Sequence, residues 1–306
     1  MNNPRKHLIS LTHIEDVDGI GAQAILLRKF PNIICFQTFY SEFNEFIKKI
    51  FDLNPDILYI TDIGFNESYR EVYEILGKMK NVCWIDHHLI SEPDKAELKK
   101  YIKNFIHATD KTVAAELTQQ IFLPDDEISK KIAKLGYFRD NTIENFESDR
   151  LQAIIEINQN NRKNIQKIVE LLSKGEFKNK WIQEQYNIYL KEEKIEYKKL
   201  EDRAREFQIK RVKVVISFSP FFATGKQTRY LLKNFNADIV FGVNPRFQLV
   251  SIKSHDINVK KIAEEFGGGG HFDRSGFSYA NLLDENDKLS SEFIEKVLKA
   301  VRENLD

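Results

Sequence analysis

The first half of the chain alternates short apolar runs with longer stretches in which apolar residues recur every three or four positions. The apolar runs cover 8–11, 33–39, 57–60 and 82–85, and the stretches with helical spacing cover 22–30, 42–51 and 69–79. Short runs rich in Ile, Val and Leu are typical of buried parallel strands, and a period of 3.6 is typical of helices. The alternation predicts an α/β domain with a parallel sheet and right-handed crossovers.

Charged residues dominate from residue 148 to about 209, after two further expected helices at 112–121 and 127–138. Apolar residues still lie at helical spacing there, at Ile165, Ile168, Val169 and Leu172, and a second charged helix is expected over 180–207. A charge-rich helix is usually a solvated surface, so we interpret 148–210 as a helical linker. It would follow an N-terminal domain of residues 1–147.

The remaining segment, 211–306, predicts a second and smaller α/β domain with a mixed sheet. Strands are expected at 212–218, 237–243 and 247–252, and helices at 225–235, 258–266 and 291–305. Between 211 and 280 there are ten Lys and Arg against five Asp and Glu. This modest excess of positive charge favours a small anionic substrate, or the end of a nucleic-acid strand, over a long nucleic-acid duplex.

Composition narrows the class of protein. The formal net charge is zero, so no global field indicates a nucleic-acid or membrane partner. The two cysteines, Cys35 and Cys83, lie in strand-like runs and predict buried free thiols in a reducing compartment. No apolar run reaches the ~18 residues of a membrane span, and the N-terminus lacks a signal-peptide core. We therefore expect a cytoplasmic protein with no membrane partner.

Polar, metal-competent side chains follow three of the predicted strands. His13, Asp16 and Asp18 follow the first, Asp62 the third, and Asp86-His87-His88 the fourth. In open α/β sheets the carboxyl ends of the strands share one edge, where ligands bind. Carboxylates that meet in one cleft repel one another unless they are protonated or neutralised by cations. Each Asp alone is well explained as a turn or helix-cap residue, but their combination predicts a metal centre.

The donor set favours particular ions. Carboxylate oxygens prevail and one or two imidazoles join them, which favours Mn²⁺, with Mg²⁺ or Co²⁺ as alternatives, over a thiolate-rich zinc site. Two ions ~3.5–4 Å apart need a bridging carboxylate. Asp62 lies between the other two clusters and is the expected bridge.

Taken together, these motifs resemble the DHH family of phosphoesterases, named for the triplet that stands here as Asp86-His87-His88. The acidic loop, the strand-end Asp62 and the glycine-histidine stretch Gly267–His271 occur in the order that the family shows. The resemblance spans nearly the whole chain. It implies a catalytic domain, a helical linker and a DHH-associated domain, in the branch with RecJ-type exonucleases, oligoribonucleases and cyclic-dinucleotide phosphodiesterases.

The resemblance also implies roles for individual residues. One Mn²⁺ would be held by His13, Asp16 and Asp62, and the other by Asp18, Asp62, His87 and Asp140. His88 would face the scissile phosphate, and Asp86 would orient a histidine. In the second domain, Gly268, Gly269, Gly270 and His271 would bind a substrate phosphate through a nest of backbone N–H groups, aided by Lys253.

The chain departs from the family pattern at three places. His13 and Asp16 are three residues apart, where other branches have two or four. Lys253 stands where the family usually has Arg, which removes a bidentate donor. Phe272-Asp273-Arg274 replace small residues after the glycines. Phe272 would either stack on a base or fill a strand core.

The function implied is hydrolysis of short oligonucleotides or single-stranded nucleic-acid ends to nucleoside monophosphates by a two-metal mechanism. The expected partners are short single-stranded RNA or DNA or a dinucleotide, and a second copy of the chain in a homodimer. Two alternatives stay open, a cyclic-dinucleotide phosphodiesterase and a catalytically inactive replisome scaffold.

Overall fold

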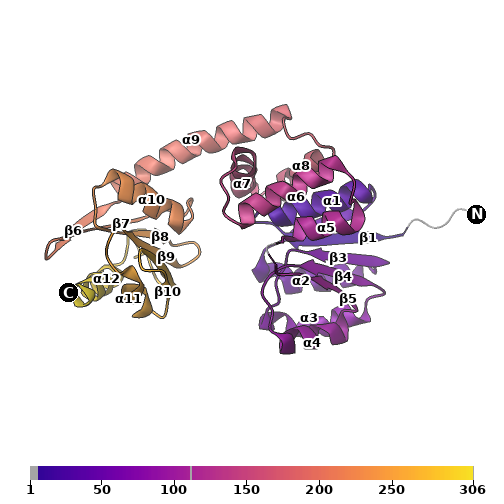
Figure 1. Ribbon diagram of the computed structural model, residues 1–306, viewed down its shortest axis with the longest axis horizontal. Coiled ribbons are helices and arrows are strands. Elements are labelled where there is room, and N and C mark those ends of the chain that lie inside the picture. The colour runs from indigo at the N-terminus through magenta and orange to yellow at the C-terminus, as the bar shows by residue number, and fades with distance from the viewer. Residues whose placement is uncertain (1–5, 111, 306) are drawn as a thin grey trace, which may run out of the picture. The chain divides into compact units, whose positions relative to one another are not determined.

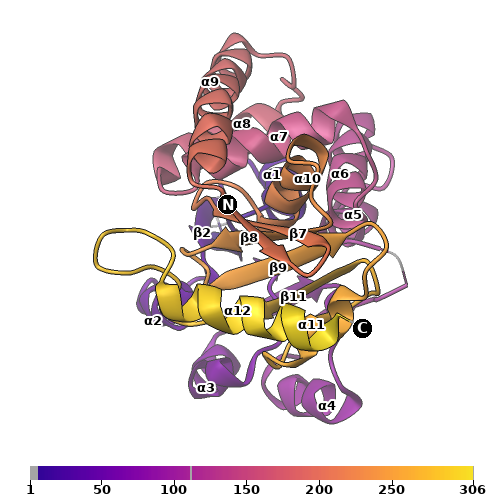
Figure 2. The same ribbon diagram turned by 90° about the vertical axis from the view of Figure 1, so that its left-hand side faces the viewer.

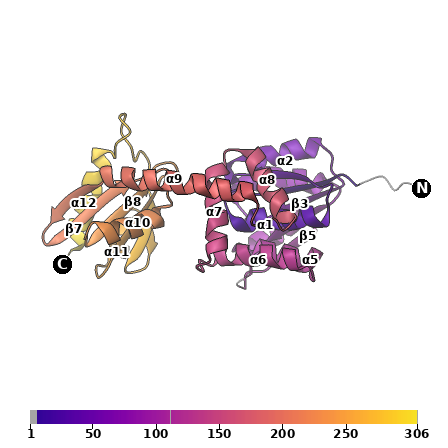
Figure 3. The ribbon, with the colours of Figure 1, turned by 90° about the horizontal axis from the view of Figure 1, so that it is seen from above.

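The computed structural model describes residues 6–110 and 112–305, which divide into two compact units, Met1–Tyr189 and Leu190–Asp306 (Figure 1). The chain passes from one unit to the next within a single long helix, α9 (Lys180–Asp202) (Figure 3). Within the described ranges, no helix is both long and apolar enough to cross a bilayer.

A five-stranded sheet, entirely parallel, forms the centre of the first unit. Its strand order is β2-β1-β3-β4-β5, with β1 (Leu8–His13), β2 (Ile34–Thr38), β3 (Ile57–Thr61), β4 (Val82–Asp86) and β5 (Asn104–His107). The chain leaves β1 toward β2 and then returns to the other side of β1 with β3. Such a reversal creates a crevice beyond the carboxyl ends of the strands. The carboxyl ends of β1 and β3 therefore border the expected ligand site.

Helices cover both faces of this sheet (Figure 1). One face carries α1 (Val17–Lys29), α5 (Ala114–Phe122), α6 (Glu127–Asp140), α7 (Phe146–Asn158) and α8 (Arg162–Ser173). The other face carries the short turns η1 (Tyr40–Glu42) and η2 (Glu67–Tyr69) and the helices α2 (Phe43–Asp52), α3 (Arg70–Lys78) and α4 (Glu92–Tyr101). Strands buried on both faces explain their continuous apolar runs.

The second unit holds a six-stranded mixed sheet of order β10-β11-β9-β8-β7-β6, in which only β7 and β8 are parallel to each other. The strands are β6 (Arg205–Ile209), β7 (Val212–Phe218), β8 (Ile239–Asn244), β9 (Leu249–Ser254), β10 (Gly269–Gly270) and β11 (Arg274–Ser278). Helices α11 (Val259–Glu264) and α12 (Ser291–Asn304) pack on one face (Figure 2). The other face packs against α10 (Thr224–Asn234) and the C-terminal part of α9.

The structure confirms the predicted α/β class with its parallel first sheet and mixed second sheet. One detail of the sequence prediction is wrong. The second charged helix ends at Asp202, and residues 205–209 form β6, which pairs with β7. Helices α7 and α8, which we assigned to the linker, pack into the core of the first unit. The division at 147 and 210 stays a prediction.

Candidate metal centre

The loop that joins β1 to α1 contributes His13 and Asp16. Asp16 is the N-cap of α1, and its Oδ1 accepts a hydrogen bond from the N–H of Gly19 at 3.0 Å. Its Oδ2 lies 3.2 Å from Nδ1 of His13. A Cβ at Gly19 would lie 2.6 Å from the carbonyl oxygen of His13 and 3.0 Å from Oδ2 of Asp62. Glycine therefore lets the first turn of α1 approach both side chains.

Asp18 lies in the first turn of α1 and is buried. Its two oxygens accept hydrogen bonds from the N–H groups of Ala114 and Ala115, at 2.7 and 2.8 Å. These N–H groups begin α5, whose own N-cap residue supplies no side-chain bond. A carboxylate stabilises such a helix start. Asp18 thus joins α5 to the site.

Asp62 follows β3 in a left-handed backbone conformation, with φ of 56°, and is buried. Its N–H donates to the carbonyl oxygen of Ile85 on β4, at 3.1 Å. The buried indole of Trp84 donates to the carbonyl oxygen of Ile63, at 2.9 Å. A left-handed conformation is uncommon outside glycine but is tolerated by Asp and Asn. The hydrogen bonds to β4 hold the Asp62 backbone in this left-handed conformation.

The triplet begins at the end of β4 with Asp86, which is buried. Nδ1 of His88 donates to Oδ1 of Asp86 at 2.8 Å. This hydrogen bond raises the pKa of His88 to about 9. The carbonyl oxygen of His88 accepts from Nε2 of His107, at 2.7 Å. Asp86 and His107 therefore fix the His88 ring and backbone respectively.

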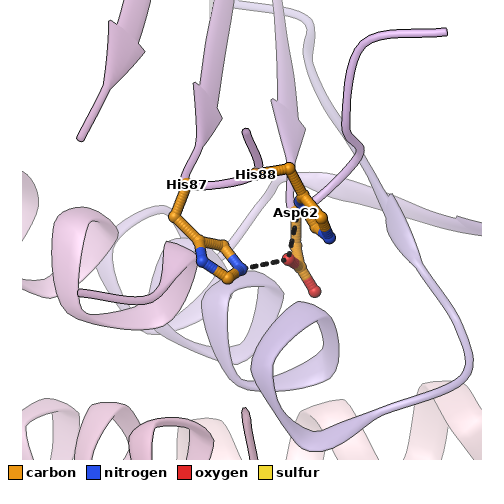
Figure 4. A group of neighbouring side chains, drawn as sticks. All are labelled: Asp62, His87 and His88. Carbon is orange, nitrogen blue, oxygen red and sulfur yellow. Dashed lines mark ion pairs between the residues drawn. The ribbon is translucent and has the colours of Figure 1, made fainter. Parts of the chain in front are cut away.

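His87 points into the centre of the site. Its Nε2 is buried, has no hydrogen-bond partner among the described residues, and lies 3.4 Å from Oδ1 of Asp62 and 3.6 Å from Oδ2 of Asp18 (Figure 4 shows the first contact). On the far side of the ring, Nδ1 lies 4.0 Å from Oδ2 of Asp140 at the end of α6. A buried imidazole nitrogen aimed at two carboxylates fits a cation between them.

Within the described residues, two groups could hold a metal ion, and Asp62 belongs to both. They are Asp62 with His87 and His88, and His13 with Asp16 and Asp62; within each group the ligand atoms lie within 4.8 Å of one another. Burial and the charge of Asp16 raise the pKa of Asp62. Burial and the charges of Asp62 and Asp16 likewise raise the pKa of Asp18. Cations bound between Asp16, Asp18 and Asp62 would relieve the repulsion between these carboxylates.

The imidazole of His13 compensates part of this charge. Burial alone would lower its pKa, but hydrogen bonds to Asp16 and Glu15 raise the pKa of His13 to about 10. Although burial opposes it, the bond from His13 lowers the pKa of Asp16 to about 2. The loop after β1 therefore carries an ion pair, whereas the contacts of Asp18 and Asp62 with Nε2 of His87 are longer, at 3.6 and 3.4 Å.

Comparison with known families agrees with this geometry. The N-terminal domain of the DHH family matches residues 7–138, which include every residue of the site described so far except Asp140. The first unit therefore carries a DHH-family N-terminal domain. Among curated protein sequences, none matches it.

Solved structures share the fold of this chain at low sequence identity. A pGpG-specific phosphodiesterase from Vibrio cholerae is 14% identical with a TM-score of 0.54, and the match covers 97% of this chain and 98% of that one. RecJ of Thermus thermophilus in complex with Mn²⁺ is 17% identical with a TM-score of 0.59, covering 97% of this chain and 52% of RecJ. RecJ in complex with Mg²⁺ is 14% identical, with a TM-score of 0.51 and coverage of 97% and 50%.

The second unit contains the glycine stretch expected to bind substrate, and its structure corrects one interpretation. The N–H of Gly268 donates to Ala263 and that of His271 to Arg274, so these two groups do not form an anion nest. Gly268 instead permits close packing, because a Cβ there would lie 2.2 Å from the carbonyl oxygen of Gly276. Gly269 and Gly270 form the edge strand β10.

Lys253 lies on β9 directly opposite Arg274 on β11, the strand that also pairs with β10. Within the described residues, neither cation has an ion-pair partner, and like charges directly opposite each other are unfavourable. Phe272 is 54% exposed, so it does not fill a strand core. This edge of the second sheet therefore combines two cations, an exposed aromatic ring and His271.

The sequence did not indicate two residues that support the DHH triplet and the candidate metal site. His107 is not among the site residues predicted from the sequence, yet it ends β5 in register with Asp86. Its position at a strand end, like that of Asp62, was the available signal. Glu15 was not singled out, although Nε2 of His13 lies 2.7 Å from its carboxylate. Sequence spacing alone does not indicate which ring nitrogen has which partner.

Proposed function

We propose that the chain is a phosphodiesterase that uses two divalent ions, Mn²⁺ by preference, to hydrolyse short single-stranded oligonucleotides to nucleoside monophosphates. The observation that carries the proposal is Nε2 of His87, which is buried, accepts or donates no hydrogen bond within the described residues, and faces Asp18 and Asp62. Metals of this kind take nitrogen and oxygen ligands together. The residues present therefore fit a metal centre in a DHH-family domain.

Two ion sites with a shared ligand account for the arrangement. His13, Asp16 and Asp62 would hold one ion, and Asp18, Asp62 and His87 the other. Asp140 lies near the far nitrogen of His87, so we assign it the role of orienting that ring rather than of binding the ion. When bound, two ions would activate a water and stabilise the charge that develops on the phosphoryl oxygens.

His88 would act on the substrate rather than on the ions. Asp86 holds its Nδ1 at 2.8 Å, and its side chain is 40% exposed. The other ring nitrogen, Nε2, is then left to approach a phosphoryl or leaving oxygen from the solvent side. A protonated imidazole in this position can donate a hydrogen bond to the phosphate and a proton to the leaving group.

The second unit would bind the substrate's phosphate and base. Lys253 and its cross-strand neighbour Arg274 provide positive charge, and the guanidinium of Arg274 supplies the bidentate donor that Lys253 lacks. The exposed ring of Phe272 offers a surface on which a base can stack. His271 lies between this ring and the glycines.

Relatives support a short substrate. The Vibrio neighbour is described as pGpG-specific and matches over nearly its whole length, whereas RecJ matches over about half of its length. A dinucleotide is thus the substrate we expect to be cleaved fastest.

A hydrolysis panel tests the proposal. Metal-free protein would be given labelled dinucleotides, ~24-residue single strands of RNA or DNA, and cyclic di-AMP, each with Mn²⁺, Mg²⁺ or EDTA. We expect Mn²⁺-dependent cleavage of the dinucleotide to monophosphates and no cleavage in EDTA. Faster cleavage of cyclic di-AMP would instead favour the cyclic-dinucleotide alternative. Absence of both Mn²⁺ binding and hydrolysis would refute the proposal and favour the scaffold.

A further inference from the structure

Glu15 makes a contact that the family resemblance does not explain. Its Oε2 lies 2.7 Å from Nε2 of His13, while Nδ1 of the same ring lies 3.2 Å from Oδ2 of Asp16. His13 is 8% exposed and the Glu15 side chain 30% exposed. One buried imidazole is thus held between two carboxylates that differ in their surroundings.

Only one of these carboxylates belongs to the metal group. Asp16 lies with Asp62 and His13, all within 4.8 Å, and Asp16 approaches Nδ1 of His13. Within the described residues, no metal group includes Glu15. Nδ1 of His13 is therefore the nitrogen available to an ion. Nε2 is the nitrogen whose N–H needs an acceptor outside the metal group.

The position of Glu15 is itself fixed by the fold. Its backbone oxygen accepts a hydrogen bond from Nε2 of Gln152 on α7, at 2.9 Å. Tyr40 packs on the His13 ring from another direction, with ring centroids 4.6 Å apart. The three-residue spacing between His13 and Asp16 places Glu15 immediately before the capping Asp16. The loop is therefore built to hold Glu15 beside the outer nitrogen.

We infer that Glu15 is a positioning residue of the first ion site, where its carboxylate holds Nε2 of His13 so that Nδ1 faces the ion. The inference rests on the proposed function, since it needs a metal at His13, Asp16 and Asp62. A metal-ligating histidine usually donates its second N–H to a carboxylate, which fixes the ring and strengthens the ligand. Removal of such a partner typically weakens metal affinity by about 10–100-fold.

The experiment measures Mn²⁺ affinity of the EDTA-treated full-length chain by calorimetry. We expect Glu15→Ala to weaken one of two ion sites by about 10–100-fold. Glu15→Gln, which retains an acceptor oxygen and nearly the same shape, should have a smaller effect. The melting temperatures of the metal-free variants should stay close to that of the wild type, which separates positioning from a general loss of structure.

A double-mutant cycle with His13→Ala identifies the route of the effect. If Glu15 acts through His13, Glu15→Ala should cause no further loss of affinity in the His13→Ala background. An equal loss in both backgrounds would overturn the inference, because Glu15 would then bind the ion directly. Tighter binding by Glu15→Ala would also overturn it, because the carboxylate would then compete with the ion for His13.

The wild type separates this inference from the proposed function. If it binds two Mn²⁺ ions and both Glu15 variants bind them equally well, the inference fails and the proposed function stands. If the wild type binds no Mn²⁺, both fail.

Discussion

Replacement of Asp62 by Asn should stabilise the metal-free protein and weaken its response to metal. Burial and the charge of Asp16 raise the pKa of Asp62, so its ionised form destabilises the folded state at neutral pH. Asn keeps the shape of the side chain and tolerates the left-handed φ of 56°. Asp62→Asn therefore removes a charge without adding backbone strain.

The size of the effect follows from the distances. Oδ1 of Asp62 and Oδ2 of Asp18 lie 3.4 and 3.6 Å from the same nitrogen of His87, so they are at most about 7 Å apart. At an effective dielectric constant of about 20, two charges at that separation repel by about 2 kcal/mol. In a unit of this size, removal of that repulsion should raise the melting temperature by roughly 4–8 °C.

Bound metal should make the wild type more stable than Asp62→Asn. Each bound ion at 100 times its dissociation constant stabilises the folded state by about 2.7 kcal/mol. Asp62 is common to both metal groups, so Asp62→Asn should lose most of this gain at both sites. We expect the variant to melt above the wild type in EDTA and below it in excess Mn²⁺, with turnover reduced by several orders of magnitude.

The assay is thermal unfolding at pH 7.5 in EDTA and in excess Mn²⁺. Asp56→Asn is a matched control, because Asp56 lies just before β3, at the opposite end of that strand, and bonds to His7 and Lys80. In this control, excess Mn²⁺ should raise the melting temperature as much as in the wild type, and the melting temperature in EDTA should equal that of the wild type. A lower melting temperature of Asp62→Asn in EDTA together with an undiminished Mn²⁺ response would refute the shared-ligand reasoning.

Two further predictions concern other parts of the chain. Arg28 binds both oxygens of Asp126 at 2.7–2.8 Å and holds the pKa of Asp126 well below its usual range. Asp126→Asn should lower the free energy of unfolding by about 1–2 kcal/mol at pH 7. Urea titrations should show the difference shrinking as pH falls below ~4, where the unfolded wild type takes up the proton; a constant difference would contradict this. His271→Ala should raise KM for a dinucleotide by about tenfold with unchanged Mn²⁺ affinity, and weaker metal binding would show that His271 is misplaced.

The sequence predicted the elements whose burial leaves a regular pattern. Strands β1, β3 and β4 are buried on both faces and read as continuous apolar runs. Helix α4 was missed because Leu98 is its single buried residue. Its start was nevertheless signalled by Ser91 as N-cap and by the following Pro93. Strand β6 was assigned to a helix because its charged residues hid the alternation of Phe207 and Ile209.

Some features of the candidate site, like some elements of the fold, could be predicted from the sequence, and others could not. Strand ends in a parallel sheet share one edge, so the meeting of Asp16, Asp62 and His87 followed from the strand order alone. Partners of single atoms did not follow, because they depend on ring orientation and loop geometry. Examples are the contact of Glu15 with Nε2 of His13 and that of Asp140 with Nδ1 of His87, which arise only in the folded loop and helix end.

The sequence left helix capping and metal binding as alternatives for the aspartates, but these roles are compatible in the structure. Asp16 caps α1 with one oxygen and faces His13 with the other. Asp18 binds the first N–H groups of α5 and still lies 3.6 Å from Nε2 of His87. Replacing either residue would disturb a helix start as well as the candidate metal centre. The carboxylate of Asp62 has no hydrogen bond from a backbone N–H within the described residues, so its replacement reports on electrostatics and metal binding without the loss of a cap.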